Sequence, residues 1–172
     1  MAARRREQAT YQDLIDAPDN LTAELVDGEL FLSPRPRARH SDLLTEIAAH
    51  LRLRLVRGWV ILSAPEVHLG RDVFVPDIAG WRRERLSLGD EVGIEVVPDW
   101  VCDRRVKLPK YAHYGVKHAW VVDLVSRTLE VKRLTNGAWV EVAVFNADEP
   151  FRAEPFEELE IVLDVQWPSP PS

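Results

Sequence analysis

The segment VPDWVCDRRVK, residues 97–107, passes from an apolar run almost directly into a charged one. Residues 100–102 predict a buried β-strand, and residues 106–114 predict a short helix that Gly115 ends. Asp103 and Lys107 lie at the junction between these two elements. The shortness of the junction bears on whether the two side chains can act together.

Length and composition indicate a soluble globular chain. The 172 residues suit one domain with its own core, and 46% of them are hydrophobic and 29% charged. We therefore expect residues 1–172 to form a single domain with frayed termini at about 1–9 and 167–172. No apolar run is long enough to span a bilayer, so no membrane association is expected.

The charge and the cysteine content narrow the function classes. A formal net charge of -6 argues against sequence-independent coating of nucleic acid, which needs a dominant positive field. This net charge is still compatible with an enzyme that binds nucleic acid through a local cluster of basic residues. Cys102 is the only cysteine, which excludes an intramolecular disulfide and favours a reducing, cytoplasmic location. Because Cys102 lies in an apolar run, we expect a buried structural thiol.

Hydrophobic periodicity predicts three elements in the first third of the chain. They are a short helix over 11–17, a hairpin over 23–32 and a long helix over 41–56. Asp27 and Gly28 between two alternating runs are a strong hairpin signal. Ser41 is expected to cap the long helix.

The rest of the chain is mainly strand-like. Strands are expected at 60–62, 66–69, 73–78, 119–123, 128–134, 139–144 and 159–163, with 95–97 and 100–102 as one interrupted strand and 81–88 as a charged connection. This order predicts a mixed α/β (α+β) fold in which a curved mixed sheet is flanked by the long helix. The exposed hairpin edge at 139–144 could pair two chains, so a homodimer is left open.

Two acidic residues fall at predicted strand ends. Asp77 follows Pro76, and a proline inside a strand forces an edge or a bulge that re-aims side chains. Asp77 is therefore either a surface turn residue or a metal ligand. Asp103 is either the N-cap of the next helix or a second carboxylate ligand. Two such carboxylates can hold Mg²⁺ (or Mn²⁺), because Mg²⁺ takes few protein ligands and keeps several waters.

Basic residues lie close to these acids in the sequence. Lys107 could orient or activate an attacking water and stabilise the developing phosphorane charge. Two clusters of basic residues make either a phosphate-binding rim or ordinary solvated charge: Arg35, Arg37 and Arg39 before the long helix, and Arg104, Arg105, Lys107 and Lys110 beyond Asp103. His40, at the mouth of the long helix, could cap it, pack against it or reach phosphate.

Glu130 and Lys132 match the E-x-K spacing of a nuclease motif. They alternate along a strand that turns at Asn136 and Gly137, so outward-facing side chains of a solvated hairpin account for them. We therefore do not expect this pair to be catalytic.

The order of several motifs resembles the Uma2 (DUF820-type) family of the restriction-endonuclease-like PD-(D/E)xK superfamily. The matching pieces are AELVDGEL at 23–30, SPRP at 33–36, His40, VPD at 75–77, VPDWV at 97–101, KLPKYA at 107–112, GV at 115–116, HAWVVD at 118–123 and LEV at 129–131. The resemblance covers roughly residues 10–165. It implies a restriction-endonuclease-like core and a Mg²⁺-dependent endonuclease that hydrolyses DNA.

The resemblance also implies roles for particular residues. Glu24 would stand at the family's N-terminal acid, and Asp77 would be the aspartate of the PD motif. Lys107 would be the catalytic lysine, moved onto the following helix. The Arg37, Arg39, Arg104 and Arg105 side chains, with His40, are the candidates for contacting DNA.

The chain departs from the family pattern at the junction. The family normally ends the strand after Pro98 and Asp99 with a glutamate, and a Ser/Thr-rich loop and an aspartate then precede the lysine. Here Asp103 is either the substitute for that glutamate or the later aspartate with the glutamate deleted. The second alignment implies a catalytically disabled nuclease fold that binds nucleic acid or a protein partner. A purely structural or oligomerising domain is a third interpretation.

Overall fold

The computed structural model describes residues 8–55, 58–165 and 167. Its helical elements in this part of the chain are α1 (Tyr11–Ile15), α2 (Ala38–Arg54), the 3-10 turn η1 (Arg105–Lys107) and α3 (Leu108–Tyr114). None of the helices found there has the length and apolarity needed to cross a bilayer. The predicted fraying at residues 1–7 and 168–172 lies outside the described residues, whereas Ala9 is tied down by a 2.8 Å hydrogen bond to the carbonyl of Gly28.

The first sheet is built on the predicted hairpin. Its strands run in the order β2 (Glu29–Pro34), β1 (Leu21–Val26), β5 (Asp72–Phe74), β4 (Glu66–Leu69) and β7 (Gly93–Ile94). Asp27 and Gly28 both adopt positive φ, of 54° and 76°, as a two-residue turn between right-twisted strands requires. The hairpin prediction is therefore confirmed.

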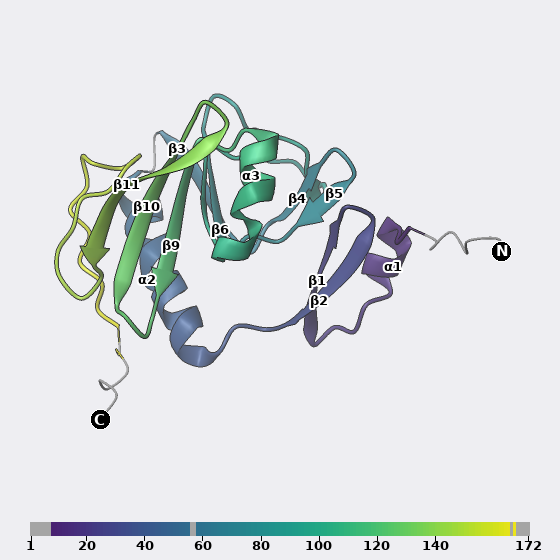
Figure 1. Cartoon of the computed structure of the whole chain (residues 1–172), viewed down its shortest axis with the longest axis horizontal. Coiled ribbons are helices and arrows are strands. Elements are labelled where there is room, and N and C mark those ends of the chain that lie inside the picture. The colour runs from purple at the N-terminus through teal and green to yellow at the C-terminus, as the bar shows by residue number, and fades with distance from the viewer. Residues whose placement is uncertain (1–7, 56–57, 166, 168–172) are drawn as a thin grey trace.

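The second sheet is larger and mixed. Its order is β11 (Ala138–Asn146), β10 (Thr128–Thr135), β9 (His118–Asp123), β8 (Trp100–Cys102), β6 (Ile78–Arg82) and β3 (Trp59–Ser63). β8 runs parallel to β9, and the other neighbours are antiparallel. The mixed α/β class is confirmed, and the strands divide between two sheets (Figure 1).

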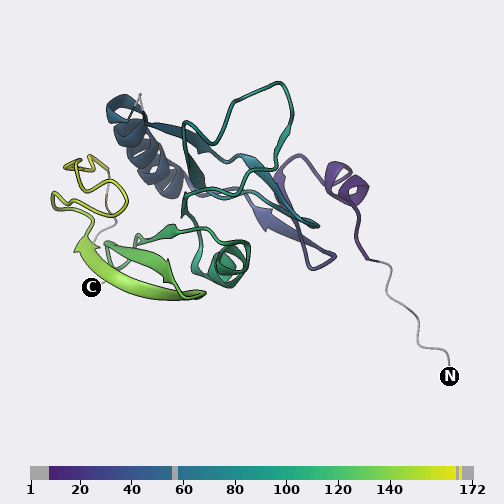
Figure 2. The same cartoon turned by 90° about the horizontal axis from the view of Figure 1, so that it is seen from above.

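Successive residues of β8 point to opposite faces of the second sheet, as the period of a strand dictates. Trp100 and Cys102 join the core under α2, whereas Val101 joins the core under α3. The two helices thus cover opposite faces of this sheet (Figures 1 and 2). β8, whose three residues are all buried, is the central support of the junction that follows it.

Pro76 marks the place where the chain changes sheets. Residues 73–78 were expected as one strand, but β5 ends at Phe74 in the first sheet and β6 begins at Ile78 in the second. Proline has no N–H to donate to a ladder, which explains the break. Asp77 therefore lies in the link between the two strands, directly before the first residue of β6.

Four further expectations were wrong. The segment 81–88 begins inside β6, the segments 95–97 and 100–102 are not one strand, and 159–163 contributes only the bridge between Phe151 and Ile161. Ser41 does not cap α2, which begins at Ala38 after Arg37. The strand errors share a cause, because partner strands are set by neighbours that are distant in sequence.

Candidate functional site

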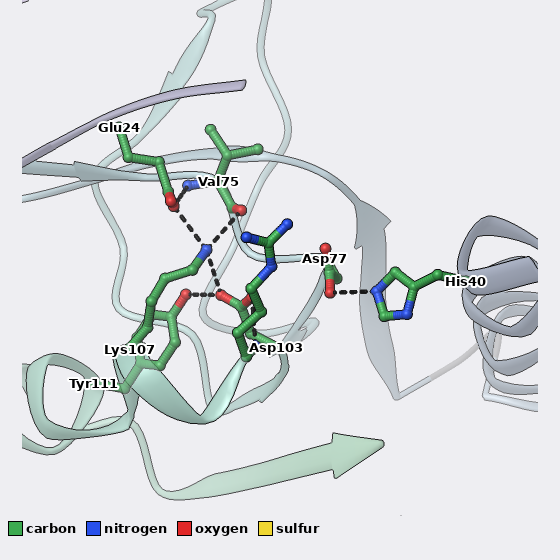
Figure 3. A network of polar contacts seen from close by, with 8 residues as sticks. Glu24, His40, Val75, Asp77, Asp103, Lys107 and Tyr111 are labelled. Atoms are coloured by element: carbon green, nitrogen blue, oxygen red, sulfur yellow. Dashed lines mark hydrogen bonds and ion pairs between the residues drawn. The ribbon is translucent and has the colours of Figure 1, made fainter. Parts of the chain in front are cut away.

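Asp77 and Asp103 are brought together by strand pairing. β6 and β8 are antiparallel, with Ile78 opposite Cys102. The next residues outward in this register are Asp77 and Asp103, which lie near one another in Figure 3. The backbone of Asp103 still hydrogen-bonds the carbonyl of Trp120, so it continues the strand pairing instead of starting the helix.

Lys107 is the centre of the polar network. Its Nζ lies 2.7 Å from Oδ2 of Asp103, 2.8 Å from Oε1 of Glu24 and 3.1 Å from the carbonyl oxygen of Val75 (Figure 3). An ammonium group has three protons to donate, and each has an acceptor here. Lys107 is therefore held in one position, with its side chain only 14% exposed.

Glu24 reaches this network from the first sheet. Its Oε1 also accepts a 2.7 Å hydrogen bond from the backbone N–H of Val75, in the link between β5 and β6. The residue is only 7% exposed. One oxygen of Glu24 thus binds both the ammonium of Lys107 and the backbone where the chain crosses between the two sheets.

Asp103 is buried and fully engaged. Its Oδ2 accepts from Lys107 and from the hydroxyl of Tyr111, and its Oδ1 accepts a 2.7 Å hydrogen bond from the backbone N–H of Arg104. Burial raises the pKa of Asp103 to about 6, and the charge of Asp77 adds to this rise. The Lys107 ammonium and the Tyr111 hydroxyl oppose it but do not overcome the loss of solvation.

The pKa of Lys107 is raised above its usual value, which favours the charged lysine. The pKa of its partner Asp103 is also raised, which disfavours the charged carboxylate. Burial lowers the pKa of Lys107, but the two carboxylates of Asp103 and Glu24 together outweigh the burial. Asp103 has one cation beside it and a second anion nearby, whereas Lys107 has two anions. The difference in partners explains why burial prevails at Asp103 alone.

His40 is attached to Asp77. Its Nε2 lies 3.0 Å from Oδ2 of Asp77, and both side chains are partly buried (Figure 3). His40 is near the start of α2, so this contact connects the long helix to the strand-end acids. The histidine therefore faces the carboxylate instead of capping the helix.

The four candidate arginines differ in their surroundings. Arg37 and Arg39 are exposed at the start of α2, on either side of Ala38. Arg104 is exposed beside Asp103. Arg105 instead forms an ion pair with Glu130 on β10. The first three are placed to meet a phosphate from solution, and the fourth is already neutralised.

The Glu130 and Lys132 pair lies within the β10–β11 hairpin. Lys132 is only 7% exposed and lies 3.0 Å from carboxylate oxygens of both Glu130 and Glu141. The expectation of a solvated, outward-facing lysine is wrong, because a register shift after Val131 places Lys132 opposite Glu141. The pair is neutralised by its neighbours and by Arg105.

Tyr111 is the site residue that the sequence analysis missed. It follows Lys107 by four residues, which is the spacing of side chains on one helical face. That spacing could have revealed it. The carbonyl of Val75 has no such signal, because any residue supplies one.

The donor chemistry fits a hard divalent cation. Carboxylate oxygens are the ligands that Mg²⁺ and Mn²⁺ prefer, and Mg²⁺ needs only one or two of them. Oδ1 of Asp77 has no hydrogen-bond partner among the described residues, and Oδ1 of Asp103 has only the Arg104 N–H. Within that part of the chain no three His, Cys, Asp or Glu side chains gather as a metal cluster. The ligand set is therefore sparse.

Comparisons with known proteins show the family and the fold. A family model described as "Uma2: Putative restriction endonuclease" matches residues 8–166. A crystal structure described as a putative nuclease belonging to DUF820, from Anabaena variabilis, has a TM-score of 0.71 at 20% identity, covering 90% of this chain and 94% of the other. No curated protein matches. At this identity the structural likeness concerns the fold alone.

Proposed function

Because the chain belongs to the Uma2 family, we propose that it is a Mg²⁺- or Mn²⁺-dependent endonuclease that hydrolyses DNA phosphodiester bonds. The family description and the fold of the structural neighbour both support a nuclease. The observation that supports the proposal most is the largely buried ammonium of Lys107, 2.7 Å from Asp103, which is next in register to Asp77.

Each side chain has a defined task in this proposal. Asp77 and Asp103 would hold the cation, which when bound supplies Lewis-acid polarisation of the phosphodiester and a more acidic water. Lys107 would orient the attacking water and stabilise the negative charge that develops on the phosphorus oxygens, and to do so it must release one of its three acceptors, Asp103, Glu24 or the Val75 carbonyl. Glu24 is a positioning residue, because it contacts Lys107 and a backbone N–H but no reacting atom.

DNA would be held by charge that is local. The chain has a net charge of -6, so its overall field does not attract DNA. Arg104 is exposed next to Asp103, and Arg37 and Arg39 are exposed within three residues of His40, which contacts Asp77, so all three can pair with phosphate oxygens. Such contacts fix the position of the strand without reading its sequence.

One observation favours the second candidate, a nuclease fold that binds without cutting. Lys107 and Tyr111 both occupy Oδ2 of Asp103, so a cation would have to use the other oxygen or displace them. A protein of this kind would bind nucleic acid or a protein partner through the same surface. We therefore keep it as the alternative.

Mn²⁺ binding and plasmid cleavage test the proposal together. We would titrate Mn²⁺ by calorimetry into the wild type, Asp77→Asn and the control Asp90→Asn, which changes an exposed acid in another loop. We expect cleavage by the wild type and by Asp90→Asn, and loss of both Mn²⁺ affinity and cleavage in Asp77→Asn. Salt-dependent DNA binding without cleavage, together with equal Mn²⁺ affinity in the wild type and in Asp77→Asn, would establish the alternative.

A further inference from the structure

A small pocket opens directly beside the lysine. It has a volume of about 180 Å³ and is lined by residues from β1 and β2, from β5, and from the junction and α3. Glu24 and Lys107 form one side of it, so it is continuous with the polar network. Phe31, Phe74 and Val106 supply its apolar surface.

Strand register explains why Phe31 is in this pocket. Phe31 on β2 lies directly opposite Glu24 on β1, and side chains of such a pair share one face of the sheet. Phe31 is 48% exposed, and Val106, which also lines the pocket, is 79% exposed. Phe74 beneath them is fully buried. The pocket is thus lined by two exposed apolar residues, Phe31 and Val106, and by the buried Phe74.

Cationic groups accompany these walls. Arg104, Lys107 and Lys110 all line the pocket. Lys110 is partly neutralised by Asp27 and Asp72, but the guanidinium of Arg104 has no hydrogen-bond or ion-pair partner among residues 8–55, 58–165 and 167. The free positive charge at this site is therefore at Arg104.

Four larger hollows have other linings. Those of about 680 Å³ and 920 Å³ contain acidic residues and no lysine or arginine, so they would repel a phosphate-bearing ligand. One of about 300 Å³ has Arg52 and Arg83, which donate to the carbonyls of Ile61 and Trp59, and one of about 370 Å³ combines Arg71 and Lys110 with Asp27 and Asp72. An apolar, aromatic surface next to an unpaired arginine is instead the combination that a nucleotide needs.

We propose that this pocket receives one unstacked base of a single-stranded or locally unpaired DNA segment, with the base against Phe31 and an adjacent phosphate on Arg104. Every base has a π-face, so stacking on an aromatic ring tolerates any sequence. A base inside a duplex cannot offer that face unless it is extruded. The inference rests on the proposed function and deepens it, because it selects unpaired DNA as the substrate class.

The position of the pocket relates stacking to cleavage. Lys107 belongs both to the pocket lining and to the contact with Asp103. A base held on Phe31 therefore brings the neighbouring phosphodiester towards Lys107 and the strand-end acids. Stacking would place the scissile bond, and Phe31 would be a positioning residue for it.

The test is binding of a single-stranded oligonucleotide of about eight nucleotides, a length within the usual range for such sites, with one central 2-aminopurine. Fluorescence is titrated in EDTA, so that no hydrolysis occurs. The proteins are the wild type, Phe31→Ala, Phe31→Trp, Arg104→Ala and Leu32→Ala. Leu32 is the matched control, because it is 45% exposed on the same strand and does not line the pocket.

We expect quenching of 2-aminopurine with the wild type, Phe31→Trp and Leu32→Ala. Phe31→Ala should bind about tenfold more weakly without quenching, the loss typical of one base–aromatic stack. Arg104→Ala should lower the slope of log affinity against log salt by about 0.7, the value for one phosphate on single strands. Thermal unfolding of each variant checks that the half-exposed substitutions leave the fold intact.

Equal binding by Phe31→Ala and Leu32→Ala, or equal affinity for duplex and single strand, would overturn the inference. Its failure is distinguishable from failure of the proposed function. Cleavage that is independent of Phe31 would keep the nuclease and refute the pocket. Phe31-dependent stacking by a protein that never cleaves would keep the pocket and refute the nuclease.

Discussion

Lys107 lies 2.8 Å from the carboxylate of Glu24, although 83 residues separate the two along the chain. This contact joins the β1–β2 hairpin of the first sheet to the junction that follows β8 in the second. It also places a second anion beside a lysine that already contacts Asp103. The stability of the site therefore depends on the balance of three buried charges.

Removal of the buried cation should be costly. Lys107→Met leaves the carboxylates of Asp103 and Glu24 buried without their cation, and breaking a buried ion pair in this way costs about 3 kcal/mol. Urea unfolding at neutral pH would measure the free energy of unfolding. Lys117→Met, at an exposed lysine, is the control and should be nearly neutral. Equal losses in the two variants would contradict the prediction.

The stability of the protein should depend on pH through Asp103. Its pKa is raised from 3.8 to about 6 in the folded state, so between these values the folded protein holds a proton that the unfolded chain has released. Stability therefore falls as pH rises through this window. The size is on the order of 1.4 kcal/mol for each unit by which the pKa is raised.

Asp103→Asn removes this titration and keeps an oxygen that can accept from Tyr111. Relative to the wild type, the variant should become progressively more stable as pH rises from about 4 to about 7, by the amount given per pKa unit. Urea unfolding at several pH values would follow the difference. A constant difference across the window would show that Asp103 does not titrate there.

Cys102 should be chemically inert in the folded protein. Its thiol is buried, and burial together with the nearby charges of Asp77 and Asp103 raises its pKa well above the ordinary value. A chromogenic aromatic disulfide reagent should modify the unfolded chain at once and the native protein at least about tenfold more slowly. Equal rates in both states would mean that β8 is not protected.

His40 should support metal binding through Asp77. Loss of the 3.0 Å contact in His40→Ala frees the Asp77 carboxylate to rotate, and removing such a supporting partner typically costs about tenfold in metal affinity. His40→Gln can keep the hydrogen bond and should rescue much of this loss. His50→Gln, on the same helix, is the control. Mn²⁺ titration would measure the affinity of each variant. An unchanged affinity in His40→Ala would show that His40 does not support metal binding.

Dimerisation through the free sheet edge stays a prediction. β11 is an edge strand of the second sheet, and Val140 and Val144 on it are 44% and 52% exposed. Unpaired edges of this kind can pair with a second copy. Light scattering coupled to size exclusion should then show a dimer in the wild type and a monomer after Val144→Lys. A wild type that is monomeric at all concentrations would contradict the predicted dimer.

Several features of the fold were predictable because they depend on neighbouring residues. The turn at Asp27 and Gly28 needs two residues of positive φ, and the capping box of α1 needs only Thr10 and Asp13. Gly115 ends α3 in the left-handed conformation that glycine allows. Each of these signals acts over a few residues, so sequence reasoning could find it.

The polar network was predictable in part of its membership, since Tyr111 was missed, but not in its arrangement. Glu24, Asp103 and Lys107 were each singled out. No pattern in the neighbouring sequence indicated that Lys107 would donate to both carboxylates and to the carbonyl of Val75. Arg105 was expected at the rim and instead pairs with Glu130. The choice among such partners depends on which strands pair, and strand pairing is not local.

The sequence by itself determined the family, the mixed α/β class and the local elements, because turn residues, caps and periodicity act along the chain. Only the tertiary structure decided that the chain crosses between sheets at Pro76, that Asp103 continues β8, and that Phe31 opens a pocket beside Lys107. Those outcomes follow from burying both faces of β8 at once and from satisfying the buried charges, and these demands are met by residues far apart in sequence.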